Sequence, residues 1–264
     1  MRKILTVLGL AALFGLAAGS ASADMMKVRI GTEGAYPPFN YIDDNGQLQG
    51  FDIDIASALC DAAKFKCEFV VQDWDGIIPG LLAKKYDAII ASMSITAERK
   101  KKVDFTDKYY NTPAKFIAKK GAKFDLTPAG LKGKSIGVQR ATIHENFVRD
   151  NFPDADLRVY ATQDEANADL VSGRLDLVLA DSVALLEGFL KTPAGKDFAF
   201  IGPGYSDPKW FGDGAGIAVR KGEGNLRKAL NKAIAQIRKD GTYKKINDKY
   251  FDFDVYGKPP APSM

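Results

Sequence analysis

Strand-like and helix-like segments alternate along this chain in two blocks, and this alternation constrains the fold more than any other feature. The first block contains three expected strands and two helices, in the order Val28–Thr32, Phe51–Ala63, Phe65–Val71, Ile77–Ala83 and Asp87–Ala91. The second contains Ser135–Val138, a helix after Thr142, Leu157–Tyr160, Asp164–Ser172, Asp176–Ala180 and Val183–Leu190. Each block has the pattern of a mainly parallel sheet covered by helices.

A shorter segment follows the glycine-rich stretches 202–204 and 212–216. Its expected strand, Ile217–Arg220, and helices, Asn225–Asp240 and Tyr243–Tyr250, are too few for a separate core, so we expect them to pack on the first block. The sequence therefore predicts an α/β fold of two lobes joined by two crossings. Lobe 1 would comprise 24–111 and 214–264, and lobe 2 would comprise 112–213.

The N-terminus has the three parts of a secretory signal peptide. Arg2 and Lys3 precede an apolar run over 4–18, and Ala21-Ser22-Ala23 is a small-residue cleavage site. The apolar run is shorter than a bilayer span requires. We expect residues 1–23 to be removed and the protein to be periplasmic. The acidic and basic residues that remain nearly balance in number, so we expect no basic surface that would bind a nucleic acid partner.

Cysteine and histidine usage excludes most metal chemistry. Cys60 and Cys67 are the only cysteines, and a helix, turn and strand would bring them close. In an oxidising compartment we favour a disulfide over two free thiols. His144 is the single histidine, expected in the first turn of a helix, so no metal site or cofactor is expected. The glycines in 212–216 lack the dinucleotide spacing and precede a strand.

The segment 87–99 indicates a pocket for a small carboxylate. An apolar strand runs into Ser92 and Ser94, Thr96 is a plausible helix N-cap, and Arg99 follows. A helix start favours an anion, and arginine can bind a carboxylate through two hydrogen bonds. The alternative is that Arg99 opens a solvated basic face, because three lysines follow it.

A series of short motifs runs along the chain in a characteristic order: Ile30-Gly-Thr-Glu-Gly-Ala-Tyr-Pro-Pro-Phe39, Gly50-Phe-Asp-Ile-Asp54, Trp74-Asp-Gly-Ile-Ile-Pro79, Ser92-Met-Ser-Ile-Thr96, Gly137-Val-Gln-Arg-Ala-Thr142, Gly173-Arg-Leu-Asp176 and Lys249-Tyr-Phe-Asp-Phe-Asp-Val-Tyr-Gly257. Together with the cysteine pair, they resemble the periplasmic polar amino-acid-binding proteins of ABC importers, most closely the lysine/arginine/ornithine- and histidine-binding group. The resemblance implies a Venus-flytrap fold that binds an amino acid without being an enzyme. It implies a monomer whose partners are permease transmembrane subunits with a separate cytoplasmic ATPase.

By position, the resemblance places eleven residues around the ligand: Glu33, Tyr36, Trp74, Ala91, Ser92, Ser94, Arg99, Gln139, Thr142, Ile143 and Asp181. It implies that Arg99 holds the α-carboxylate, helped by Ser94 and by backbone N–H groups around 142–143. Asp181, with Ser92, would take the α-ammonium. Such pairing is what a zwitterion removed from water requires. The alternative for Asp181 is a helix N-cap.

The expected specificity is for a cationic side chain. Tyr36 and Trp74 would sandwich the ligand side chain and Glu33 would face its tip, although ordinary core packing would also explain both rings. Ala91, Glu33 and Ile143 stand where enteric relatives carry serine, aspartate and threonine, and Trp74 and Gln139 replace apolar residues. Arginine is the first choice, followed by ornithine, lysine and histidine, with opines as an alternative.

An enzyme is the main alternative from another class. The same two-lobed fold hosts periplasmic dehydratases, and fold does not imply function. Glu33 is the one candidate general acid or base, but no nucleophile–base pair or metal cluster accompanies it in the sequence pattern. We therefore expect no catalytic residue.

Overall fold

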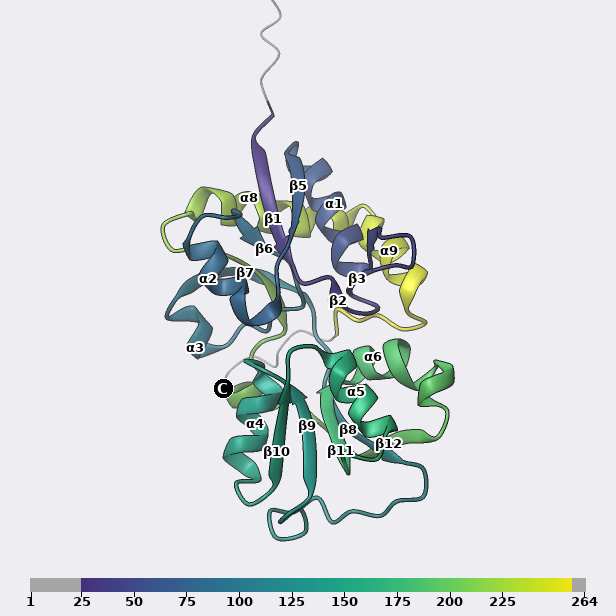
Figure 1. Ribbon diagram of the computed structural model, residues 1–264. Helices are drawn as coiled ribbons and strands as arrows, with labels where there is room; N and C mark the ends of the chain where they lie inside the picture. The colour runs from purple at the N-terminus through teal and green to yellow at the C-terminus, as the bar shows by residue number, and fades with distance from the viewer. Residues whose placement is uncertain (1–24, 258–264) are drawn as a thin grey trace, which may run out of the picture.

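The computed structural model describes residues 25–257, which form two lobes that lie end to end (Figure 1). Each lobe is built around a five-stranded sheet. The expected signal peptide, residues 1–23, lies outside the described residues. Within 25–257, none of the helices combines the length and apolar character that a membrane crossing requires.

Lobe 1 contains a sheet with strand order β5-β1-β6-β13-β7. These strands are β1 (Lys27–Thr32), β5 (Lys66–Val71), β6 (Ala88–Ile89), β7 (Val103–Tyr110) and β13 (Ala215–Arg220). The helices of this lobe are α1 (Phe51–Ala63), α2 (Ile77–Leu82), α3 (Ala97–Lys100), α8 (Gly224–Lys239) and α9 (Thr242–Tyr250), with a 3₁₀ turn at Trp74–Gly76. A small antiparallel sheet joins β2 (Ala35–Tyr36), β3 (Asn40–Ile42) and β4 (Leu48–Gln49).

Lobe 2 contains a sheet with strand order β10-β9-β11-β8-β12. Its strands are β8 (Ala114–Lys119), β9 (Ser135–Gln139), β10 (Asp156–Tyr160), β11 (Leu177–Asp181) and β12 (Phe198–Tyr205). Its helices are α4 (Ile143–Asn151), α5 (Gln163–Val171), α6 (Ser182–Leu185) and α7 (Pro208–Phe211), with a π-helical turn at Leu186–Leu190 and a 3₁₀ turn at Pro193–Gly195.

The sequence predicted mainly parallel sheets, whereas both sheets are mixed. In lobe 1, β1 pairs in parallel with β5 and β6, but β13 is antiparallel to β6 and β7. Lobe 2 repeats this pattern, because β8 is antiparallel to β11 and β12. The antiparallel strands are those next to the two crossings, where the chain leaves one sheet and enters the other. The two-lobed α/β fold itself is confirmed, while the expected boundaries at 111/112 and 213/214 stay predictions.

Six strands were missed by the sequence analysis, namely β7, β8 and β12 of the two large sheets and β2, β3 and β4 of the small one. The glycine-proline-glycine stretch 202–204, which the sequence analysis treated as a break before the last segment, lies inside β12. This is possible because β12 is an edge strand, and its pairing with β8 shifts register between Ile201 and Tyr205. Proline is tolerated at such edges and irregularities.

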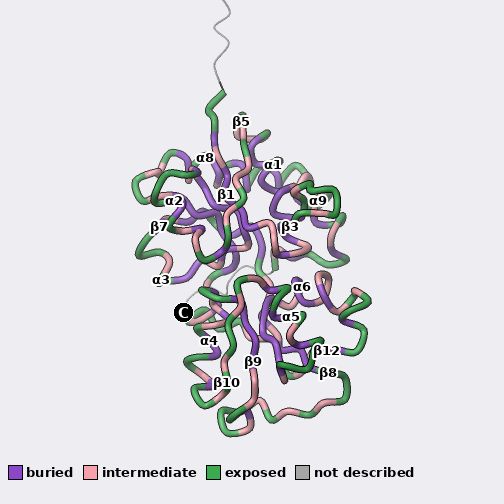
Figure 2. The backbone as a smooth tube through the Cα atoms, viewed as in Figure 1, coloured by how far each residue is buried: buried purple, intermediate pink, exposed green. Residues whose placement is uncertain are grey.

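A buried core runs through the strands of both lobes (Figure 2). In lobe 1, Phe51, Ile55 and Leu59 of α1 are fully buried against the sheet. The disulfide between Cys60 and Cys67 links the end of α1 to the start of β5, with 6.1 Å between the two Cα atoms. The disulfide expected from the sequence is therefore present.

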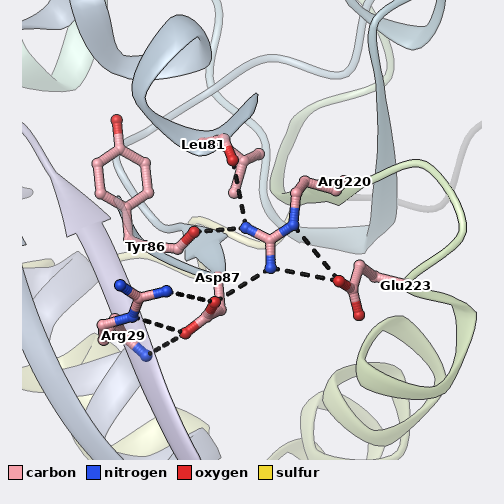
Figure 3. Close-up of polar contacts among 6 residues, drawn as sticks. All are labelled: Arg29, Leu81, Tyr86, Asp87, Arg220 and Glu223. Atoms are coloured by element: carbon pink, nitrogen blue, oxygen red, sulfur yellow. Dashed lines mark hydrogen bonds and ion pairs between the residues drawn. The ribbon is translucent and has the colours of Figure 1, made fainter. Parts of the chain in front are cut away.

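Asp87 holds three elements of lobe 1 together at the start of β6 (Figure 3). Its carboxylate accepts hydrogen bonds from Arg29 of β1 at 2.9 Å and from Arg220 of β13 at 3.0 Å. Arg220 also donates to the backbone oxygen of Tyr86 at 2.5 Å. Burial alone would raise the pKa of Asp87, but these arginines outweigh it and lower the pKa to about 2. The cluster fixes β6, whose far end leads into the pocket described next.

Candidate functional site

A pocket of about 600 Å³, a volume that includes its opening to solvent, lies between the two lobes. All eleven residues that the sequence analysis placed around a ligand line it. The other lining residues, which that analysis did not assign, are Tyr110, Asn111, Thr112, Ala114, His144, Phe211, Gly214 and Ala215. Most of these residues lie in or beside the two crossings. No motif identified them in the sequence, and only their expected position between the two sheets could have indicated that they line the pocket.

Arg99 provides a positive charge at one end of the pocket. Thr96 caps α3 by accepting a hydrogen bond from the Arg99 backbone N–H at 3.2 Å, as expected. The Arg99 guanidinium donates to the Ser94 backbone oxygen at 3.1 Å, and its carbon lies 5.1 Å from the Trp74 ring centroid. Among residues 25–257, no salt bridge includes Arg99, and burial lowers its pKa to about 10. An anion at this point would compensate the charge of this half-buried guanidinium.

The start of α4 lies at the same end of the pocket but belongs to lobe 2. The Thr142 hydroxyl accepts a hydrogen bond from the Glu145 N–H at 3.2 Å and donates to the Gln139 backbone oxygen at 2.7 Å. Capping therefore occupies the Thr142 side chain. The first N–H groups of a helix have no intrahelical acceptor, and the field at a helix start favours negative charge. Both lobes thus present anion-binding groups to one place.

Asp181 is a helix N-cap, which is one of the two interpretations considered for it, while its role toward an α-ammonium stays a prediction. Its Oδ1 caps α6 by accepting from the N–H groups of Val183 at 2.8 Å and Ala184 at 3.1 Å. Its Oδ2 accepts from the Thr112 hydroxyl. The side chain also lines the pocket, and burial raises its pKa. A buried carboxylate with these partners can still accept a hydrogen bond from an ammonium group.

Ser92 is held by a buried network that the sequence analysis missed. Asp52, which is fully buried, accepts from Ser92 Oγ at 2.9 Å, Tyr109 at 2.8 Å and Asn40 at 2.8 Å. Burial raises the pKa of Asp52 to about 6 against the opposing effect of these hydrogen bonds. Because the Ser92 hydroxyl donates to Asp52, its oxygen remains free to accept from a ligand. In the sequence, the only feature that could have indicated a role for Asp52 is its place in the motif 50–54.

Glu33 provides a negative charge at another part of the pocket wall. Its side chain is 6% exposed, and its Oε1 accepts a hydrogen bond from Gln139 Nε2 at 2.5 Å. Burial raises the pKa of Glu33 to about 7, and Asp164, Asp73 and Asp52 add to the rise. A neutral amide compensates the Glu33 carboxylate only in part, so a cation would stabilise its charged form.

Residues 139–141 of lobe 2 contact lobe 1 at three points, and we call these contacts the interlobe clasp. The first is the hydrogen bond from Gln139 to Glu33. The second is a salt bridge between Arg140 and Asp75 at 2.6 Å. The third is the hydrogen bond from Trp74 Nε1 to the backbone oxygen of Ala141 at 3.1 Å. The structure is therefore a form in which the lobes touch across the pocket.

Residues 25–257 contain no group of three or more histidine, cysteine, aspartate or glutamate side chains that could hold a metal ion.

Comparison with known proteins gives consistent matches over nearly the whole chain. The model of the bacterial extracellular solute-binding proteins, family 3, matches residues 28–253. An L-arginine-binding protein of Pseudomonas aeruginosa is 52% identical over 257 residues, covering 97% of this chain and 99% of the relative. The lysine/arginine/ornithine-binding periplasmic protein of Escherichia coli is 45% identical over 259 residues, covering 97% of this chain and 100% of the relative.

A solved structure shares the fold. A Salmonella typhimurium periplasmic binding protein described as having high arginine specificity superposes with a TM-score of 0.80 and 34% sequence identity. The superposition covers 86% of this chain and 99% of that one.

Proposed function

This chain belongs to family 3 of the bacterial extracellular solute-binding proteins, and from this membership we propose that its ligand is L-arginine, bound in the pocket between the lobes. The observation that carries the proposal is the distribution of charge in that pocket. Arg99 is a half-buried cation without a salt-bridge partner among the described residues, whereas Asp181 and Glu33 are buried carboxylates. A cationic amino acid has the complementary charges.

We assign the α-carboxylate to Arg99 and the start of α4, and the α-ammonium to Asp181 and Ser92. The supporting observation is that the hydrogen bonds within the protein do not use all the donors and acceptors of these pocket-lining groups. A charge transferred from water needs both an opposite charge and satisfied hydrogen bonds. This arrangement would supply both for each end of a zwitterion.

The proposed preference for arginine rests on Glu33 and its neighbours. The Glu33 carboxylate would pair with the guanidinium, and the amide oxygen of Gln139 could accept a further hydrogen bond. Trp74 and Tyr36 line the same pocket and would pack against the side chain. All three similar proteins reported above are described as binding arginine. Ornithine, lysine and histidine follow in the expected order, with opines as the alternative.

Capture would proceed by closure of the lobes on the ligand. The proposed contacts come from both lobes, so only a closed form can make all of them at once, and ligand binding shifts the population toward it. We propose that the closed, periplasmic protein then presents the amino acid to permease transmembrane subunits that work with a separate ATPase. We also propose that it acts as a monomer and releases the ligand chemically unchanged.

The test is a thermal unfolding series with single amino acids and opines, followed by mass analysis of the stabilising compound. Ligand at a thousand times its dissociation constant adds about 4 kcal/mol to the free energy of unfolding. We expect L-arginine to give the largest rise in Tm and to be recovered intact. A larger rise with neutral or acidic amino acids would reject the cationic assignment. Conversion of the compound would instead indicate an enzyme.

A further inference from the structure

His144 is a buried polar side chain in the pocket wall that the proposed function has not used. It is the second residue of α4, its exposed fraction is 8%, and it lines the pocket. Its imidazole makes no hydrogen bond with any residue in the range 25–257. Among residues 25–257, the fully enclosed polar side-chain atoms without a partner are Thr32 Oγ1 and Arg227 Nε, so the ring nitrogens of His144 are not fully enclosed.

The surroundings of His144 favour a negatively charged partner. Arg99, from the opposite lobe, is close enough for its charge to act on the imidazole, and burial together with this charge lowers the pKa of His144 to about 3. The ring is therefore neutral and carries one N–H donor. A guanidinium and a neutral imidazole that face one pocket can share a carboxylate. The start of α4 adds its own preference for an anion.

We propose that His144 is a ligand-binding residue that donates a hydrogen bond to the carboxylate of the bound amino acid, beside Arg99. This rests on the proposed function, because it requires an α-amino acid in the pocket. It adds a lobe 2 side chain to a grip that otherwise consists of Arg99, Ser94 and backbone N–H groups at the start of α4. The carboxylate would then contact a charged side chain from lobe 1 and a polar side chain from lobe 2.

The alternative is that His144 only fills space. Phe211 packs near it, with 6.2 Å between ring centroids and an angle of 51° between the ring planes. If His144 only fills space, the size and shape of its side chain would affect binding. The loss of affinity on substitution would then be the same whether or not the ligand carries a carboxylate. The two roles can therefore be separated by changing the ligand as well as the residue.

Binding of L-arginine and of L-argininamide, which lacks the carboxylate, should be measured for the wild type, His144→Gln and His144→Leu. Loss of a hydrogen bond to a charged group weakens binding about ten- to a hundredfold. We expect a loss of that size for His144→Leu with L-arginine, partial rescue by His144→Gln, and a smaller loss with L-argininamide. Asn146→Ala, an exposed position on the same helix, is the control and should change neither affinity.

The wild type supplies a second measurement that needs no substitution. Because His144 is the only histidine in the chain, its ring nitrogens give unambiguous NMR signals in the ¹⁵N-histidine-labelled protein. We expect saturation with L-arginine to shift these signals and to slow exchange of the ring N–H proton. Unchanged signals at saturation, or affinity losses below twofold or equal for both ligands, would overturn the role of His144. If L-arginine does not bind the wild type, the proposed ligand is wrong, and L-lysine then tests His144 through the same carboxylate.

Discussion

Gln139 of lobe 2 donates a hydrogen bond at 2.5 Å to the carboxylate of Glu33 in lobe 1, and this contact joins ligand selectivity to lobe closure. Glu33 is the residue proposed to bind a cationic side chain, and it also takes part in one of the three contacts of the interlobe clasp. A ligand that pairs with Glu33 therefore acts where the lobes meet. The electrostatic state of this one carboxylate should influence both specificity and closure.

Glu33→Gln should remove the preference for cations. The substitution removes the charge while nearly preserving shape, so a guanidinium in the pocket would be poorly compensated. We expect arginine binding to weaken by about 2–5 kcal/mol, while citrulline or glutamine changes far less or improves. Competition binding with both ligand types measures this. Equal losses for the two would mean that Glu33 only shapes the pocket.

Arginine affinity should rise with pH through about 7. The pKa of Glu33 is about 7 in the structure and 4.5 when unperturbed. Because the pKa of Glu33 is higher in the folded protein than in the unfolded chain, protonated Glu33 contributes to the free energy of unfolding. This contribution is fully present below pH 4.5 and is lost as the pH rises through 7. A cationic ligand favours the charged form, so below pH 7 binding must release the proton.

We therefore expect affinity to fall by up to about tenfold per pH unit between pH 7 and pH 5.5. Calorimetric titration in buffers with different ionisation enthalpies would count the released protons. The control is Glu33→Gln, which should flatten the profile apart from any contribution of Asp52, whose pKa is about 6. A profile that Glu33→Gln leaves unchanged would contradict this origin.

Arg99→Ala should disable recognition of the α-carboxylate. The variant leaves a buried ligand charge unpaired, at a cost of about 3–5 kcal/mol, or a hundred- to several-thousandfold in affinity. Calorimetric titration with L-arginine measures the loss. Lys102→Ala, in the exposed basic run that follows Arg99, is the matched control and should bind normally. A loss of affinity below threefold for Arg99→Ala would instead support the alternative from the sequence analysis, in which Arg99 belongs to a solvated basic face.

Arg140→Ala should weaken closure without removing a contact proposed for the ligand. The side chains of Arg140 and Asp75 are 50% and 42% exposed, so their pair contributes about 0.2–1 kcal/mol. We expect an about 1.4- to fivefold faster release of L-arginine by stopped-flow measurement, and an unchanged rate would contradict a role of this pair in closure. Arg158→Ala removes a similarly exposed pair with Asp156 inside lobe 2 and should leave release unchanged.

Closure itself can be followed by small-angle scattering. Saturation with L-arginine should reduce the radius of gyration of the wild type. An unchanged value at saturation would count against two moving lobes.

Local sequence patterns determined the elements whose causes are local. Thr96 and Thr142 cap helices where expected, because an N-cap depends on a side chain and a backbone N–H only a few residues away. The Cys60–Cys67 disulfide closes a short loop and was also predictable. The order of the motifs gave the two-lobed fold, and it selected eleven positions that all line the pocket.

Only the tertiary structure decided which of these groups meet. Glu33 and Gln139 lie 106 positions apart, and Asp52 and Ser92 lie 40 apart. His144 belongs to a polar helix start, and only the fold places it in the pocket wall, where the charge of Arg99 from the opposite lobe acts on it. Pairings of this kind depend on how two separately folded sheets are placed by the crossings between them. No periodicity or spacing along the chain records that placement, because it is set by packing between residues that are distant in sequence.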